Sequence, residues 1–199
     1  MRRQEIIDAA AAIALDDGLS AISARRVATR ADIPSGLVTH YFASIEELTS
    51  AAFVQLVTAE REGIGDRTRN LGSAVERLRA TIAAYVDPGR DRLALLWLDA
   101  WRQAADHAVL RTAVIQQMER DVVDMAEIIT SGTTSGVFHA DDEPTTVAMR
   151  ILALLDGQTA ASAIRTALAE STLDYPAVEH LLIVTAEREL GLAAGTLAT

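Results

Sequence analysis

The sequence contains no cysteine and no lysine, and it has only 4 prolines and 11 glycines among its 199 residues. The absence of cysteine excludes a disulfide framework, a thiolate metal site and a cysteine nucleophile. No stretch approaches the roughly 18 uncharged apolar residues of a membrane-spanning helix, so no membrane partner is expected. The charged N-terminus, MRRQEIIDAA, does not fit a signal peptide. We therefore expect a cytoplasmic protein.

Charge is distributed unevenly along the chain. All 18 basic residues are arginine, and 28 acidic residues bring the formal net charge to −10. An acidic chain, taken whole, argues against nucleic-acid binding, which requires a basic surface. Residues 1–45, however, hold five arginines and five acidic residues, whereas residues 46–199 hold 13 arginines and 23 acidic residues. The N-terminal segment is thus neutral, and the excess of acid lies behind it.

The hydrophobic pattern predicts an all-α protein of about nine helices, because half of the residues are hydrophobic and strand-like alternation is nearly absent. Capping boxes at Ser44–Glu47 and Ser73–Glu76 mark two helix starts. Residues 131–140, with two glycines, are the clearest loop. The predicted helices cover about 2–17, 24–31, 35–41, 44–63, 73–87, 92–105, 109–129, 144–169 and 175–190.

Residues 23–48 predict two short helices joined by a tight turn. This is the layout of a helix-turn-helix, whose second helix lies in the major groove. Such a helix needs short side chains toward base edges and phosphate donors on its flanks. An ordinary helical hairpin has the same spacing, so the pattern alone leaves both interpretations open. The candidate DNA contacts are Arg2, Arg3, Arg25, Arg26, Ser35, Leu37, Thr39, His40, Tyr41 and Ser44.

The same region resembles the tetracycline-repressor (TetR) family of transcriptional regulators over residues 3–56. The stretches that carry the resemblance are Val27-Ala28, Ala31-Asp32-Ile33, Gly36, His40-Tyr41-Phe42 and Ser44 through Leu48. RRQEIIDAA and GLVTHYF look more like the choline-responsive, BetI-like branch of the betaine pathway than the tetracycline branch. LLWLDAWRQAADHAVLR and LALLDGQTAASAI also resemble that branch.

The resemblance implies a helix-turn-helix domain at residues 1–46 and a ligand-binding and dimerisation domain at residues 47–199. It further implies a homodimeric repressor, released from a palindromic operator on double-stranded DNA by a small-molecule effector, with no cofactor and no enzymatic activity. Arg25 corresponds to a position that reaches a base in this family, although a phosphate contact is the alternative. The family usually has glycine at Asp32, tyrosine at Thr39 and lysine at Ile45. The isoleucine removes one expected phosphate contact.

Two tryptophans mark the expected ligand site. Trp97 and Trp101 share a helix face, where they either line a pocket and stack against a cation or belong to the core. The predicted ligand-binding residues are Trp97, Trp101, Met118, Val122 and Met125. The acidic second domain favours a cationic or amphipathic ligand, although a solvated surface also explains its charge. The acidic residues beside His139 lack metal-ligand spacing, so no metal site is predicted.

The helices at about 144–169 and 175–190 are apolar on more than one face. This predicts a subunit interface, and the resemblance implies a four-helix bundle across a twofold axis. A fully interior helix of a monomer is the alternative. The expected interface residues are Leu155, Ala160, Ile164, Leu181 and Thr185. The other function class that suits such a chain is an all-helical small-molecule carrier or protein–protein adaptor without DNA binding.

Overall fold

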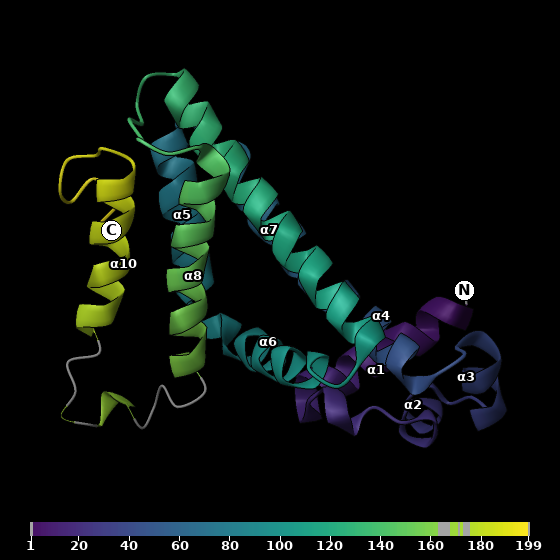
Figure 1. Cartoon of the computed structure of the whole chain (residues 1–199). Coiled ribbons are helices and arrows are strands. Elements are labelled where there is room, and N and C mark those ends of the chain that lie inside the picture. The colour runs from purple at the N-terminus through teal and green to yellow at the C-terminus, as the bar shows by residue number, and fades with distance from the viewer. Residues whose placement is uncertain (1, 163–167, 171, 173–175, 199) are drawn as a thin grey trace. The chain divides into compact units, whose positions relative to one another are not determined.

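The computed structural model describes residues 2–162, 168–170, 172 and 176–198. Within these residues the chain forms nine α-helices and no strand (Figure 1), which confirms the all-α prediction. The helices are α1 (Arg2–Asp17), α2 (Ala24–Ala31), α3 (Ser35–Tyr41), α4 (Ile45–Thr68), α5 (Ala74–Val86), α6 (Asp91–Ala104), α7 (Ala108–Thr134), α8 (Pro144–Ser162) and α10 (Pro176–Glu189). Two 3-10 turns, Leu19–Ala21 and Pro88–Arg90, precede α2 and α6.

Two helices continue beyond their predicted ends. The helix α4 passes through its glycines to Thr68, because Ile64 and Thr68 continue its buried face. The helix α7 runs to Thr134 and includes Gly132. A Cβ at Gly132 would lie 2.1 Å from the ring of Phe138. Glycine therefore sits inside the helix because the Phe138 ring packs directly across its backbone.

The chain packs as two compact units. The first comprises Met1–Glu60 and Arg92–Gln117, and the second comprises Arg61–Asp91 and Met118–Thr199. The helices α4 and α7 each contribute one segment to either unit. The boundary expected at residue 46 thus falls inside the first unit, which also includes α6 and the start of α7.

The first unit combines the three N-terminal helices with α6. The side chains predicted to be buried between the two short helices, Val27, Ala28, Val38 and Phe42, are all buried. Two carboxylates then tie later helices to this core. Asp99 of α6 accepts a hydrogen bond from the Leu19 N–H at 2.8 Å, and Glu46 accepts one from the Val109 N–H at 2.6 Å.

The turn of the helix-turn-helix depends on a left-handed residue. The Ser23 hydroxyl oxygen accepts a hydrogen bond from the Arg26 N–H and caps α2 at its start. The helix ends at Asp32, whose φ and ψ are both 51°. This conformation favours glycine, although aspartate adopts it more readily than most residues do. The geometry explains why the resembled family usually has glycine at this position.

In the second unit, α8 packs against both α5 and α10 (Figure 1). Apolar side chains from these helices, among them Leu78, Ile151 and Leu182, form the core. The carboxylate of Glu187, only 3% exposed, accepts hydrogen bonds from the Gly195 and Leu197 N–H groups at 3.0 and 2.8 Å. It thereby fastens the residues after α10. No helix of the described part is long and apolar enough to cross a membrane.

Candidate nucleic-acid interface and effector cavity

The helix α3 presents one apolar and one polar face. Val38 is 1% exposed and anchors the helix to the first unit, with Phe42 buried just after its last turn. Leu37 is half-buried. The exposed residues of α3 are Ser35, Gly36, Thr39, His40 and Tyr41. The structure thus places the predicted base-reading positions on one solvent-facing surface, with the large half-buried Leu37 at its margin.

The arginines of the N-terminal segment differ in their partners. Four of the five form ion pairs within the first unit: Arg2 with Glu5, Arg3 with Glu47, Arg26 with Asp17 and Arg30 with Asp16. Arg25 is exposed and forms no ion pair with the described residues. It shares a surface hollow with Ser35 at the start of α3. The structure therefore brings one electrostatically available cation beside the polar face of α3.

The start of α4 forms one of the two hydrogen bonds of the predicted capping box, and the other is made by Ala43 in place of Ser44. The Ser44 hydroxyl accepts a hydrogen bond from the Glu47 N–H at 3.1 Å, and the Glu47 carboxylate accepts one from the Ala43 N–H at 3.0 Å. Ile45 is 37% exposed at this helix end and offers no donor to a phosphate. The first unit as a whole holds eight arginines and ten acidic residues, a net charge of −2. A nucleic-acid interface on this unit would therefore depend on the placement of a few groups.

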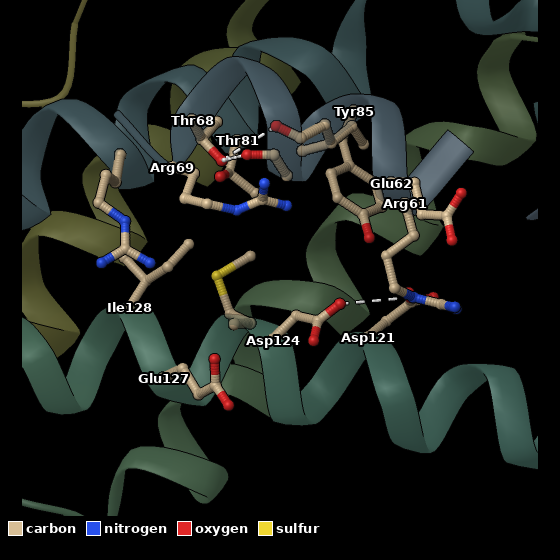
Figure 2. A pocket seen from close by; sticks show the side chains of 14 residues that line it. Arg61, Glu62, Thr68, Arg69, Thr81, Tyr85, Asp121, Asp124, Glu127 and Ile128 are labelled. Carbon is tan, nitrogen blue, oxygen red and sulfur yellow. Dashed lines mark hydrogen bonds and ion pairs between the residues drawn. The ribbon is translucent and has the colours of Figure 1, made fainter. Parts of the chain in front are cut away.

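The second unit contains a cavity of about 380 Å³ lined by residues of α4, α5 and α7 (Figure 2). Three acidic residues of α7, Asp121, Asp124 and Glu127, lie along one wall. Thr81 and Tyr85 of α5 lie along the opposite wall. The volume is at the lower end of the range for small-molecule sites.

The acidic wall is only partly neutralised. The Arg61 Nε donates to Asp121 at 2.8 Å and lies 3.5 Å from an Asp124 carboxylate oxygen. Burial raises the pKa of Asp124 because it disfavours the charged carboxylate, and Glu127 adds repulsion while Arg61 opposes the shift. Arg61 therefore lies closer to Asp121 than to Asp124, and no cation among the described residues lies as close to Asp124.

The opposite wall carries donors without acceptors. Thr81 is 6% exposed, and its hydroxyl has no hydrogen-bond partner among the described residues. The Nε of Arg77, one helical turn earlier on α5, is also buried without a partner in that part of the chain. Buried polar groups are nearly always hydrogen-bonded in folded proteins. Both residues belong to the lining of the cavity.

Two known protein families match separate parts of the chain. Residues 6–52 match the tetR family of bacterial regulatory proteins, and residues 74–190 match the C-terminal region of BetI-type transcriptional repressors. The chain belongs to the TetR family. Members of this family are transcriptional regulators rather than enzymes. The resemblance stated from the sequence, including its BetI-like branch, is confirmed.

Individual relatives are more distant. The HTH-type transcriptional regulator BetI 2 of Chromohalobacter salexigens is 28% identical over 117 residues, which cover 56% of either chain. The TetR-family chain thus spans about half the length of the curated relatives it matches. Among solved structures, a TetR transcription regulator from Haloarcula marismortui has a TM-score of 0.77 at 18% identity, over 94% of this chain and 97% of that one. A putative transcriptional regulator from Saccharomonospora viridis, solved in complex with choline, has a TM-score of 0.75 at 19% identity, over 95% and 97%. These two likenesses are likenesses of fold.

The cavity differs from the ligand site expected from the sequence. Of the five predicted residues, only Met125 lines it. Trp97 is 5% exposed in the core of the first unit, with its ring 5.0 Å from Phe53 and 5.4 Å from Trp101. Met118 is 40% exposed, and Val122 lines a separate shallow hollow. The signal that marks the cavity in the sequence is the acidic stripe of α7, at positions 121, 124 and 127.

The residues expected at the subunit interface differ in their exposure. Leu155 is 2% exposed inside the second unit, so its side chain packs within the protomer, which corrects its place in the expected interface. Ala160 and Leu181 are exposed, Thr185 is half-buried, and Ile164 lies outside the described residues. The exposed side of α8 instead presents Met149, Ala153, Gly157 and Ala160.

Asp156 of α8 provides a pH-dependent test of the second unit. Burial raises its pKa from 3.8 to about 6, with repulsion from Asp121 adding to the shift and Arg90 opposing it. A carboxyl whose folded pKa exceeds its unfolded value contributes stability that is present below the unfolded pKa and is lost as pH rises through the folded pKa. We expect Asp156→Asn to raise Tm at about pH 8 and to change it little at about pH 4.

Thermal unfolding at both pH values measures this effect, with the exposed Asp106→Asn as the control. Equal Tm changes for Asp156→Asn at the two pH values would contradict the assignment.

Proposed function

We propose that the protein is a ligand-responsive transcriptional repressor that binds a palindromic operator as a homodimer. The observation that carries the proposal is the exposed polar face of α3 beside Arg25, the arginine of the N-terminal segment that forms no ion pair with the described residues. Membership of the TetR family supports it. A repressor of this kind acts on chromosomal DNA, which supports a cytoplasmic location.

The first experiment is a gel shift with the promoter DNA beside the protein's own gene. An arginine that pairs with a guanine contributes about 1–3 kcal/mol to discrimination between bases. We expect Arg25→Ala to weaken operator binding about 5- to 150-fold and to change binding to random DNA much less. Arg30→Ala is the matched control, since Arg30 lies on the same helix but is paired with Asp16 at 3.1 Å.

Equal losses of affinity for operator and for random DNA would indicate that Arg25 contacts a phosphate and not a base. No shift by the wild type at low salt would overturn the repressor assignment and favour the carrier or adaptor.

Gly36 lies on the DNA-facing side of α3 with no internal reason to be glycine. A Cβ built there has nothing within 4 Å, and the residue is exposed. Glycine inside a helix costs about 0.5–1 kcal/mol relative to alanine. We infer that the missing side chain lets the DNA approach the helix backbone closely.

This inference predicts opposite changes in stability and binding. Gly36→Ala should raise the free energy of unfolding by up to about 1 kcal/mol and weaken operator binding by about tenfold or more. Gly63→Ala is the control, because Gly63 is also exposed in a helix with nothing within 4 Å of a built Cβ. It should stabilise the protein without changing operator affinity. Unchanged operator binding by Gly36→Ala would contradict close approach.

Homodimerisation is proposed through α8 and α10. The exposed side of α8 carries an apolar and small-residue stripe, and Leu181 of α10 is 52% exposed. An apolar face of this kind marks an interaction surface. A twofold dimer matches a palindromic operator, because each subunit reads an equivalent half-site.

Charge placed on this surface should separate the subunits. We expect Leu181→Glu and Ala160→Glu to give monomers in analytical ultracentrifugation and to abolish operator binding. Leu95→Glu, at an equally exposed apolar position of α6, should remain dimeric. A wild-type protein that is monomeric at micromolar concentration would exclude the dimer.

The effector site is proposed to be the cavity of the second unit. Its acidic wall and the incompletely neutralised Asp124 favour a ligand with a cationic group. Choline in the Saccharomonospora viridis structure supports such a ligand. Two helices that line the cavity, α4 and α7, also belong to the first unit, so an effector that binds one arrangement of these helices better shifts the population toward it.

A further inference from the structure

The effector cavity has two walls of unlike chemistry. Asp124 and Glu127 of α7 present carboxylates on one side. On the other side, α5 presents the Thr81 hydroxyl and the Arg77 Nε, both buried without a hydrogen-bond partner among the described residues. Thr81 and Arg77 are four residues apart and therefore lie on the same face of α5. Residues that carry acceptors and residues that carry donors thus line the same cavity from separate helices.

The charges around the cavity are close to balance, but their pairing is incomplete. Three arginines and four acidic residues line it. Arg61 pairs with Asp121 at 2.8 Å, and Arg69 pairs with Asp66, outside the lining, at 3.1 Å. The guanidinium of Arg77 forms no ion pair with any described residue. The Arg77 guanidinium, the Glu127 carboxylate and Asp124, which shares Arg61 with Asp121 at the longer distance of 3.5 Å, therefore line the space open to a ligand.

We propose that the cavity binds a small zwitterion, with its cationic group against Asp124 and Glu127 and its oxyanion accepting hydrogen bonds from Arg77 and Thr81. This inference rests on the proposed function of the cavity as the effector site. The oxyanion can be a carboxylate, a phosphate or a sulfonate, because each supplies acceptors for both donors. The cavity volume of about 380 Å³ limits the ligand to small metabolites.

A ligand with one charge would satisfy only half of the site. A simple cation would neutralise Asp124 but leave the Thr81 hydroxyl and the Arg77 Nε without acceptors. A simple anion would serve the α5 wall but meet the carboxylates of α7. A buried polar group left unpaired lowers affinity, so the zwitterion is discriminated from both single-charge analogues.

Isothermal titration calorimetry of the full-length protein tests this with matched probes. The probes are 4-aminobutanoate and 6-aminohexanoate as zwitterions, butylammonium as the cation and butanoate as the anion. We expect one of the two zwitterions to bind at least about tenfold more tightly than either single-charge probe.

Two variants test the contribution of each wall to ligand binding. Thr81→Val should weaken zwitterion binding several-fold and leave butylammonium binding unchanged, whereas Asp124→Asn should weaken both. Arg77→Gln tests the same donor wall if the buried Thr81→Val does not fold. Glu119→Gln is the control, since Glu119 is exposed on α7 outside the cavity lining.

Two results would overturn the proposal: butylammonium binding as tightly as both zwitterions, or neither zwitterion binding at millimolar concentration. A gel shift on the same protein distinguishes this failure from failure of the repressor assignment. Operator binding without zwitterion binding refutes only the zwitterion, and loss of operator binding by the wild type refutes the repressor.

Discussion

The edge-on contact between Phe53 and Trp97 holds α6 in the first unit. The two rings meet at 5.0 Å with their planes at 87°, and both side chains are buried. Because Phe53 lies on α4 and Trp97 on α6, this contact joins α6 to the core that holds the short helices. The helices α4 and α7 begin in this core and go on to line the cavity of the second unit. The cavity walls and the core that holds the short helices therefore share two helices.

Three carboxylates of this acidic chain accept hydrogen bonds from the backbone of segments outside their own helices. Asp99 and Glu46 accept backbone hydrogen bonds that hold α6 and the start of α7 in the first unit. Glu187 does the same for the residues after α10. Hydrogen bonds to charged groups are stronger than neutral ones, so these contacts add to the apolar packing of the segments that they hold. The net charge of −10 is thus partly a consequence of how the helices are joined.

Local interactions could be predicted from the sequence, and contacts between distant segments could not. The capping box at Ser73 and Glu76 is a contact within one helical turn, and it forms as expected. Trp97, by contrast, lies on an apolar stripe that suits a pocket or a core equally well, and its contact with Phe53, 44 positions earlier, does not show in the sequence. The cavity escaped prediction for the same reason. Its acidic and hydroxyl walls lie on separate helices, and neither wall shows in sequence that it faces the other.

The ion pairs of the N-terminal arginines also affect how the protein finds its target. An arginine that holds a carboxylate must release it before it contacts a phosphate, so each such exchange frees few counterions. The second unit, with ten arginines and 18 acidic residues, repels the DNA backbone. In the proposed complex with DNA, attraction to arbitrary sequence would therefore be weak, while the contact between Arg25 and the operator would be retained. Under the proposed function, a repressor built in this way would leave few of its molecules bound elsewhere on the chromosome, and a small number of copies in the cell would keep one operator occupied.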